Sequence, residues 1–228
     1  MNGKEIAMKI ATMESFEKKY GIEFTTRHTG KMSGMISLST SCELNPRCVK
    51  RSKISGNVCE KCFAFTQFKR YTNNRPKYER NTKALTTQDI KAEDVPLLNA
   101  LMFRFESFGD LINMQQLKNY FTIAKKNPKT KCALWTKNPD IIAKAIKAGH
   151  EKPKNLVIVY SSPAMDKETP IDQIQKKYPF VDKTFTVYSK EYLKDKPKSF
   201  VNCGGKQCLQ CGVCYKKTGC KTIREKVK

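Results

Sequence analysis

The stretch 131–160, KCALWTKNPDIIAKAIKAGHEKPKNLVIVY, contains the pattern that decides the fold. Its two ends, 131–135 and 156–160, are short and mostly apolar, as buried strands are. Between them, residues 139–149 carry apolar side chains at helical spacing. This order of strand, helix and strand predicts a βα unit, in which a helix connects two parallel strands.

The same unit recurs on both sides of this stretch. Further strands are expected at 35–40, 101–106 and 184–188. Further helices are expected at 4–20, 59–71, 89–99, 113–126 and 171–178, and a polar helix continues from 71 to about residue 84. From residue 101 the strands begin about every 24 to 30 residues, which predicts a parallel sheet with right-handed crossovers. These strands are too few for a complete eight-stranded barrel. We therefore expect an α/β fold built as an incomplete βα barrel or an open sheet.

The length of 228 residues suits one domain of ordinary size, or one domain with a small metal-binding appendage. We divide the chain into an N-terminal helix and lead-in at 1–34, the partial barrel at 35–200, and a cysteine-rich segment at 201–228. The N-terminus has no apolar stretch typical of a signal peptide, and no apolar run is long enough to span a bilayer. We therefore expect a cytoplasmic protein without a membrane partner.

The ten cysteines form two groups. Clustered cysteines in a reducing compartment indicate metal ligands more often than disulfides. Cys132 stands alone on a predicted strand, and such a cysteine is usually a small core residue. The two groups are therefore the candidate metal sites.

The second group, 203–220, contains the sharper motif, Cys208-x-x-Cys211-x-x-Cys214. Three thiolates at this spacing and a fourth nearby can ligate an iron–sulfur cubane, and we choose Cys203 as the fourth. Cys220 is the fifth candidate, beyond a turn of the chain. Zinc is the alternative.

The first group follows the first predicted strand directly and consists of Cys42, Cys48, Cys59 and Cys62. In a parallel sheet, ligands bind at the carboxyl ends of the strands. Cys59-x-x-Cys62 also opens the next predicted helix, whose dipole favours thiolates. Four thiolates can complete either an iron–sulfur site or a zinc site that fixes a long loop, and the spacing leaves both open.

Polar residues also end the other predicted strands, and we expect them to form a cup that faces the first group. The candidate catalytic residues are Glu106, Asp110 and Lys137, and the candidate cofactor-binding residues are Arg104, Trp135 and Ser161. The competing interpretation makes Arg104 and Glu106 a structural ion pair and Asp110 a helix N-cap.

The formal net charge is +23. Such a charge is typical of proteins that bind nucleic acid through its phosphates, and Lys50, Arg51 and Lys53 lie inside the first cysteine loop. Lysine is also spread along the whole chain, as on ordinary solvated surfaces. Bound thiolates would cancel part of the charge.

With these motifs assembled, the chain resembles the phage-encoded gene product eighty-eight family and, more broadly, the radical-SAM architecture. The matching pieces are Ser41-Cys42, 59–64 (CEKCFA), 104–110 (RFESFGD), 135–137 (WTK) and 208–215 (CLQCGVCY). The resemblance implies a partial barrel that binds clusters, located in the host cytoplasm if phage-encoded, and it supplies no reaction.

The first group departs from the radical-SAM motif Cys-x3-Cys-x2-Cys, which leaves one iron open for S-adenosylmethionine. Here four cysteines are available, spaced x5, x10 and x2. If all four bind iron, none remains open and cleavage of S-adenosylmethionine is not expected.

Three hypotheses follow. The first is a protein with one or two [4Fe–4S] clusters on a radical-SAM-like scaffold, which performs redox or radical chemistry on nucleic acid or a nucleotide and receives electrons from a donor. The second is a non-enzymatic zinc protein that binds nucleic acid. The third is an electron-transfer protein, which needs less scaffold than a βα barrel provides.

Overall fold

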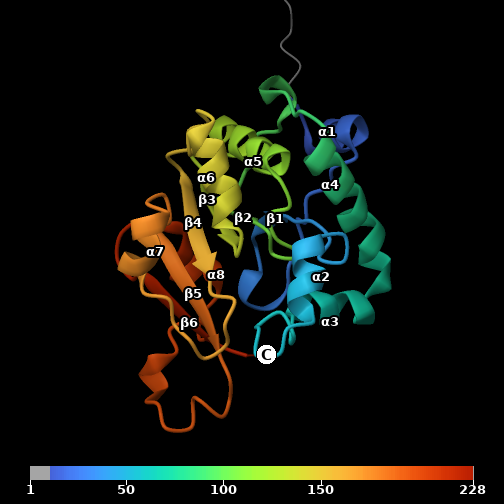
Figure 1. Ribbon diagram of the computed structural model, residues 1–228. Coiled ribbons are helices and arrows are strands. Elements are labelled where there is room, and N and C mark those ends of the chain that lie inside the picture. Colours follow the sequence, from blue (N-terminus) through green and yellow to red (C-terminus); the bar gives the residue numbers. More distant parts are fainter. Residues whose placement is uncertain (1–10, 228) are drawn as a thin grey trace, which may run out of the picture.

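A computed structural model describes residues 11–227 and contains one six-stranded parallel sheet (Figure 1). The strands are β1 (Ile36–Leu38), β2 (Met102–Phe105), β3 (Lys131–Thr136), β4 (Leu156–Ser161), β5 (Lys183–Tyr188) and β6 (Thr222–Lys226). They lie side by side in chain order, and every neighbouring pair is parallel. This confirms the α/β class and the parallel sheet, and the winding is that of a partial βα barrel.

The helices mostly precede or connect the strands. They are α1 (Met13–Tyr20), α2 (Pro46–Ser52), α3 (Phe63–Arg70), α4 (Arg75–Thr87), α5 (Met114–Lys126), α6 (Pro139–Lys147), α7 (Ile171–Lys177) and α8 (Cys208–Cys211). The predicted helices at 113–126, 139–149 and 171–178 are confirmed within a few residues. None of the helices in the described part of the chain has the length and apolar character needed to cross a membrane.

The two faces of the sheet are covered by different parts of the chain. One face packs its apolar side chains against helices, in a core that includes Phe103, Phe105 and Tyr120 of α5. The other face carries Met102 and Val157, and the C-terminal cysteine segment covers it with side chains such as Tyr215. The second cysteine group therefore lies on the face of the sheet opposite to α5.

The C-terminal segment also contributes β6. Five residue pairs join it to β5, from Thr184 opposite Thr222 to Tyr188 opposite Lys226. The residues set apart as 201–228 thus contain a strand of the same sheet, and the connection from β5 to β6 carries the second cysteine group.

Two local expectations are wrong. Instead of a helix at 89–99, the chain has one 3-10 turn at Ala92–Asp94, because Pro96 lacks an N–H and restricts Val95 before it. The helix expected at 59–71 begins only at Phe63. The first part of the helix expected at 4–20, residues 4–10, lies outside the described residues, and its last turns are α1.

Candidate metal centres

The first cysteine group occupies the connection between β1 and α3. Asn45 organises its start, because the Asn45 side chain accepts hydrogen bonds from the backbone N–H groups of Arg47 and Cys48 at the beginning of α2. A further hydrogen bond ties Asn45 Nδ2 to the backbone carbonyl of Asp110, 2.9 Å away. Cys48 is thereby placed on a capped helix that is fixed to the loop after β2.

The other members of the first group lie at the ends of elements. Cys42 follows β1, Cys59 lies in the turns before α3, and Cys62 is the N-cap residue of α3. Cys42, Cys48 and Cys59 are buried, and Cys62 is half-buried. The sequence therefore places three thiols in the interior and one at its border.

The four thiols of the first group are close enough to influence one another. Burial raises the pKa of the Cys42 thiol, and the neighbouring Cys62 raises it further. Burial also raises the pKa of Cys48, with smaller contributions from Cys59 and Cys42. Because an isolated buried thiol resists ionisation, this site favours thiolates only when positive charge is supplied.

Asp110 and Lys137 lie beside this group, as predicted from the ends of their strands. Asp110 accepts hydrogen bonds from Thr136 Oγ1 at 2.6 Å and from the backbone N–H of Lys137 at 3.0 Å. The carboxylate of Asp110 raises the pKa of Cys48, and Lys137 lowers it. Asp110 is not the N-cap of α5, because that position is Asn113.

Arg51 completes the charged surroundings of the first group. It donates to Asn138 Oδ1 at 2.7 Å, and its Nη1 lies 3.8 Å from an Asp110 carboxylate oxygen. Nη1 is buried, and residues 11–227 offer it no hydrogen-bond acceptor. Burial and, to a smaller extent, Cys62 raise the pKa of Cys59, whereas Lys137 and Arg51 act to lower it. The sequence shows that Arg51 is a basic residue of the cysteine loop, but it does not predict the contact of Arg51 with Asp110.

Glu106 is buried near Cys42 within a network of hydrogen bonds. Thr40 donates to it through N–H and Oγ1, and Gln116 Nε2 donates at 2.6 Å. The Tyr120 hydroxyl donates as well. Burial nevertheless raises the pKa of Glu106 to about 8, so this side chain holds a proton at neutral pH.

Arg104 and Glu106 neither share a face nor form an ion pair. Glu106 ends β2 with a positive φ of 58°, which breaks the alternation of the strand and turns its side chain towards Tyr120 on the helix face. Arg104 remains on the opposite face, where its guanidinium carbon lies 3.9 Å from the centre of the Trp135 ring. The expected common charged face is therefore wrong.

The second cysteine group lines a single cavity of about 330 Å³. All four predicted ligands contribute to its wall, namely Cys203, Cys208, Cys211 and Cys214. Cys220 is not among the lining residues; it is exposed and donates from its thiol to the carbonyl of Thr222. The structure thus brings together the four cysteines chosen from the sequence and leaves the fifth outside.

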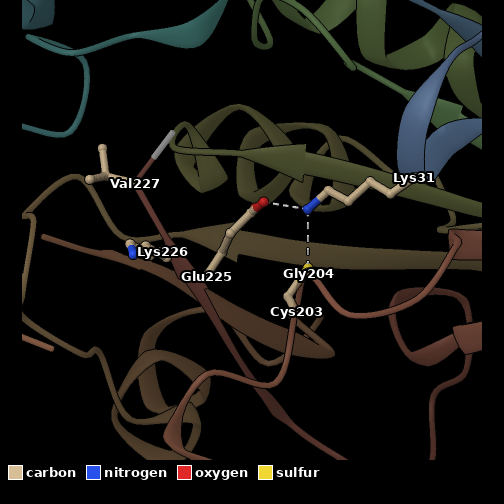
Figure 2. Close-up of a pocket in the computed structure, with 6 residues that line it drawn as sticks. All are labelled: Lys31, Cys203, Gly204, Glu225, Lys226 and Val227. Atoms are coloured by element: carbon tan, nitrogen blue, oxygen red, sulfur yellow. Dashed lines mark hydrogen bonds and ion pairs between the residues drawn. The ribbon is translucent and has the colours of Figure 1, made fainter. Parts of the chain in front are cut away.

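An adjoining cavity of about 450 Å³ reaches the same group from the other side of Cys203 (Figure 2). Lys31 lies between Cys203 and Glu225: its Nζ donates to the Cys203 sulfur at 3.4 Å and forms an ion pair with Glu225. No sequence pattern pointed to Lys31, since it comes from a 3-10 turn far from the cysteines in the chain.

Trp135 belongs with the second group rather than with a cup around the first. Its ring centre lies 6.1 Å from that of Tyr215, which follows Cys214. Ser161 is buried at the end of β4 opposite Phe185. Within residues 11–227 no hydrogen bond joins Ser161 to either cysteine group. The predicted cofactor-binding residues therefore do not surround the first group: Arg104 and Trp135 face the second group, and Ser161 shares the face of Val157 and Val159 without a hydrogen bond to either group within residues 11–227.

The arrangement of the thiols suits some metal groups better than others. Across residues 11–227, no three His, Cys, Asp or Glu side chains are arranged to hold a single metal ion. The cysteines of the second group line the cavity of about 330 Å³. Four ligands spread around a volume suit a polynuclear cluster, in which each sulfur binds a different iron.

Comparison with known proteins gives one match. The sequence model of a family described as Gene product 88 matches residues 14–224. No curated protein and no solved structure matches the chain.

Proposed function

The chain belongs to the gene product 88 family, and we propose that it is an iron–sulfur protein with two cysteine-ligated [4Fe–4S] clusters. Cys42, Cys48, Cys59 and Cys62 would hold the first cluster, and Cys203, Cys208, Cys211 and Cys214 the second. The first lies at the carboxyl end of β1, where parallel α/β proteins bind their ligands. The second lies on the face of the sheet opposite to α5.

The cavity of the second group is the observation that carries this proposal. A motif with thiols at 208, 211 and 214 is typical of iron–sulfur ligation, and the fold places Cys203, which precedes the motif in the same connection, in the same wall. Cys220, which the sequence alone could not rule out, lies outside the wall. A sequence motif and an independent arrangement in space thus select the same four residues.

Zinc is the competing occupant. Zinc draws four ligands around one ion, with sulfurs about 2.3 Å from the metal. The triplet Cys208-x-x-Cys211-x-x-Cys214 favours the cluster over zinc, which usually binds paired Cys-x-x-Cys motifs. Measurement of the bound metal distinguishes the two.

The proposed activity is redox or radical chemistry at the first group, where a cluster would supply single electrons. Around it the chain offers Lys137 and Arg51 as cations, and Glu106 as an acid that holds a proton at neutral pH. These side chains are suited to bind an anionic substrate and to provide a proton. Cleavage of S-adenosylmethionine needs an iron without a cysteine ligand, so it requires that one of the four thiols stay free.

The substrate class that we propose is a nucleic acid or nucleotide. Its phosphates complement the net charge of +23. The basic residues of the first loop bring part of this charge next to the proposed reaction centre, with Lys50 and Lys53 flanking Arg51 at the end of α2.

Single cysteine variants test the assignment of the two sites. In protein purified without oxygen, Cys59→Ser should remove the signal of the first cluster and Cys211→Ser that of the second, measured as iron per chain and by electron paramagnetic resonance. Cys132→Ser and Cys220→Ser are the matched controls and should keep the iron content of the wild type. Equal iron in all four variants, or zinc in place of iron, would refute the proposal.

A further inference from the structure

Arg104 is a largely buried cation that lacks an ionic partner. Among residues 11–227 no carboxylate forms an ion pair with it, and its Nε is buried without a hydrogen-bond acceptor. Its remaining contacts are weak: the guanidinium stacks on Trp135, and Nη1 lies 3.8 Å from the sulfur of Met32. A buried charge left in this state costs several kcal/mol, which points to an anion that compensates it.

The second cysteine group lies on the side to which Arg104 points. Met102, two residues earlier on the same face of β2, approaches the turn between Cys211 and Cys214: a Cβ added to Gly212 would lie 3.1 Å from the Met102 methyl carbon. Consistently, Arg104 lowers the pKa of Cys208 and acts in the same direction on Cys214, although burial raises both. Arg104 therefore lies beneath the cavity that the cysteines line.

Two other cations beside the cysteine groups have a carboxylate at their side. Lys31 is paired with Glu225 next to Cys203, so this pair adds little net charge. At the first group, Arg51 is likewise close to Asp110. Arg104 is thus a cation that faces the thiols of the second group, within the described chain, without a carboxylate at its side.

We propose that Arg104 is the buried counter-ion of the second cluster and raises the reduction potential of that cluster. This inference rests on the proposed function. Reduction adds one electron to the cluster and so one negative charge, and a nearby uncompensated cation stabilises the more negative state. With a chemical reductant such as dithionite as the electron source, the second cluster accepts its electron more readily with this cation than without it.

The experiment is a redox titration of the whole protein, followed by electron paramagnetic resonance, with variants at position 104. Arg104→Gln removes the charge and should make reduction of one cluster at least tenfold less favourable, which is a fall of 59 mV in its midpoint potential. Arg104→Lys keeps the charge and should stay closer to the wild type. Arg80→Gln, at an exposed position paired with Glu23, is the control and should shift neither cluster.

The assignment to one cluster is checked with Cys211→Ser, which should abolish the component that Arg104→Gln shifts. Unchanged potentials in Arg104→Gln, or a shifted component that persists in Cys211→Ser, would overturn the inference. If Arg104→Gln loses the second cluster, its retention in Arg104→Lys supports the role of the charge, and loss in both variants overturns it. Absence of iron from the wild type is a separate result, which overturns the proposed function and this inference with it.

Discussion

Glu106 makes the stability of the protein depend on pH in a way that can be calculated. Its pKa is about 8 in the folded protein, against 4.5 without the fold. The folded state therefore binds more protons than the unfolded state between these values, and stability falls as pH rises through this window. The slope approaches 1.4 kcal/mol per pH unit, so about 2.5 kcal/mol should be lost between pH 5.5 and 7.5.

Glu106→Gln removes this titration and should flatten the dependence. The amide leaves some donors from Thr40, Gln116 and Tyr120 without an acceptor, so the variant is about 1–3 kcal/mol less stable at low pH. Its disadvantage should shrink as pH rises and reverse in alkaline solution.

The assay is urea unfolding at several pH values, with wild type and variant in the same metal state. Glu79→Gln, at an exposed position, is the control and should keep the wild-type slope. Equal slopes for wild type and Glu106→Gln would refute the argument that burial keeps this carboxyl protonated.

Three further predictions concern the fold and the partner. Gly109→Ala should cost about 3 kcal/mol of unfolding free energy, because φ is +75° and the new Cβ would lie 2.6 Å from the Thr40 carbonyl oxygen. The control Gly149→Ala has a positive φ but open space around the new Cβ, and it should cost only about 1 kcal/mol. Equal losses in the two variants would contradict the steric argument. Arg47→Ala breaks the half-exposed ion pair with Asp140 that links α2 to α6. It should lower the free energy of unfolding in urea by at most about 1 kcal/mol. A loss of several kcal/mol would contradict the expectation that solvent weakens this ion pair. Binding of single-stranded DNA or RNA should weaken steeply with salt in a fluorescence titration, whereas no binding at low salt would remove nucleic acid as the partner.

The sheet could be predicted because its strands obey simple rules. Runs such as 156–160 are apolar, recur at the period of βα units, and are separated by helices with one apolar face. β6 escaped prediction because its sequence, TIREK, is mostly polar and only Ile223 is buried. Such a strand forms because it pairs with β5, and this partner cannot be read from local sequence.

The candidate sites were predictable to the extent that they follow strand ends. Asp110 and Lys137 were expected near the first cysteine group, and the structure places them beside Cys48 and Cys59. Residue alternation failed at Glu106, because a single positive φ sends its side chain to the other face.

The position of the second cysteine group on the sheet could not be predicted from the sequence. The long connection from β5 to β6 folds back over the sheet and brings the cysteines above Arg104 and Trp135. The spacing of the cysteines predicts which of them lie together, but it does not predict the course of the connection between β5 and β6 that carries them.

The content of iron and acid-labile sulfide in protein purified without oxygen tests the central claim most directly. Two [4Fe–4S] clusters predict about eight iron atoms and eight sulfide ions per chain, with visible absorbance that dithionite bleaches. A colourless protein with about two zinc ions and no sulfide would contradict the claim.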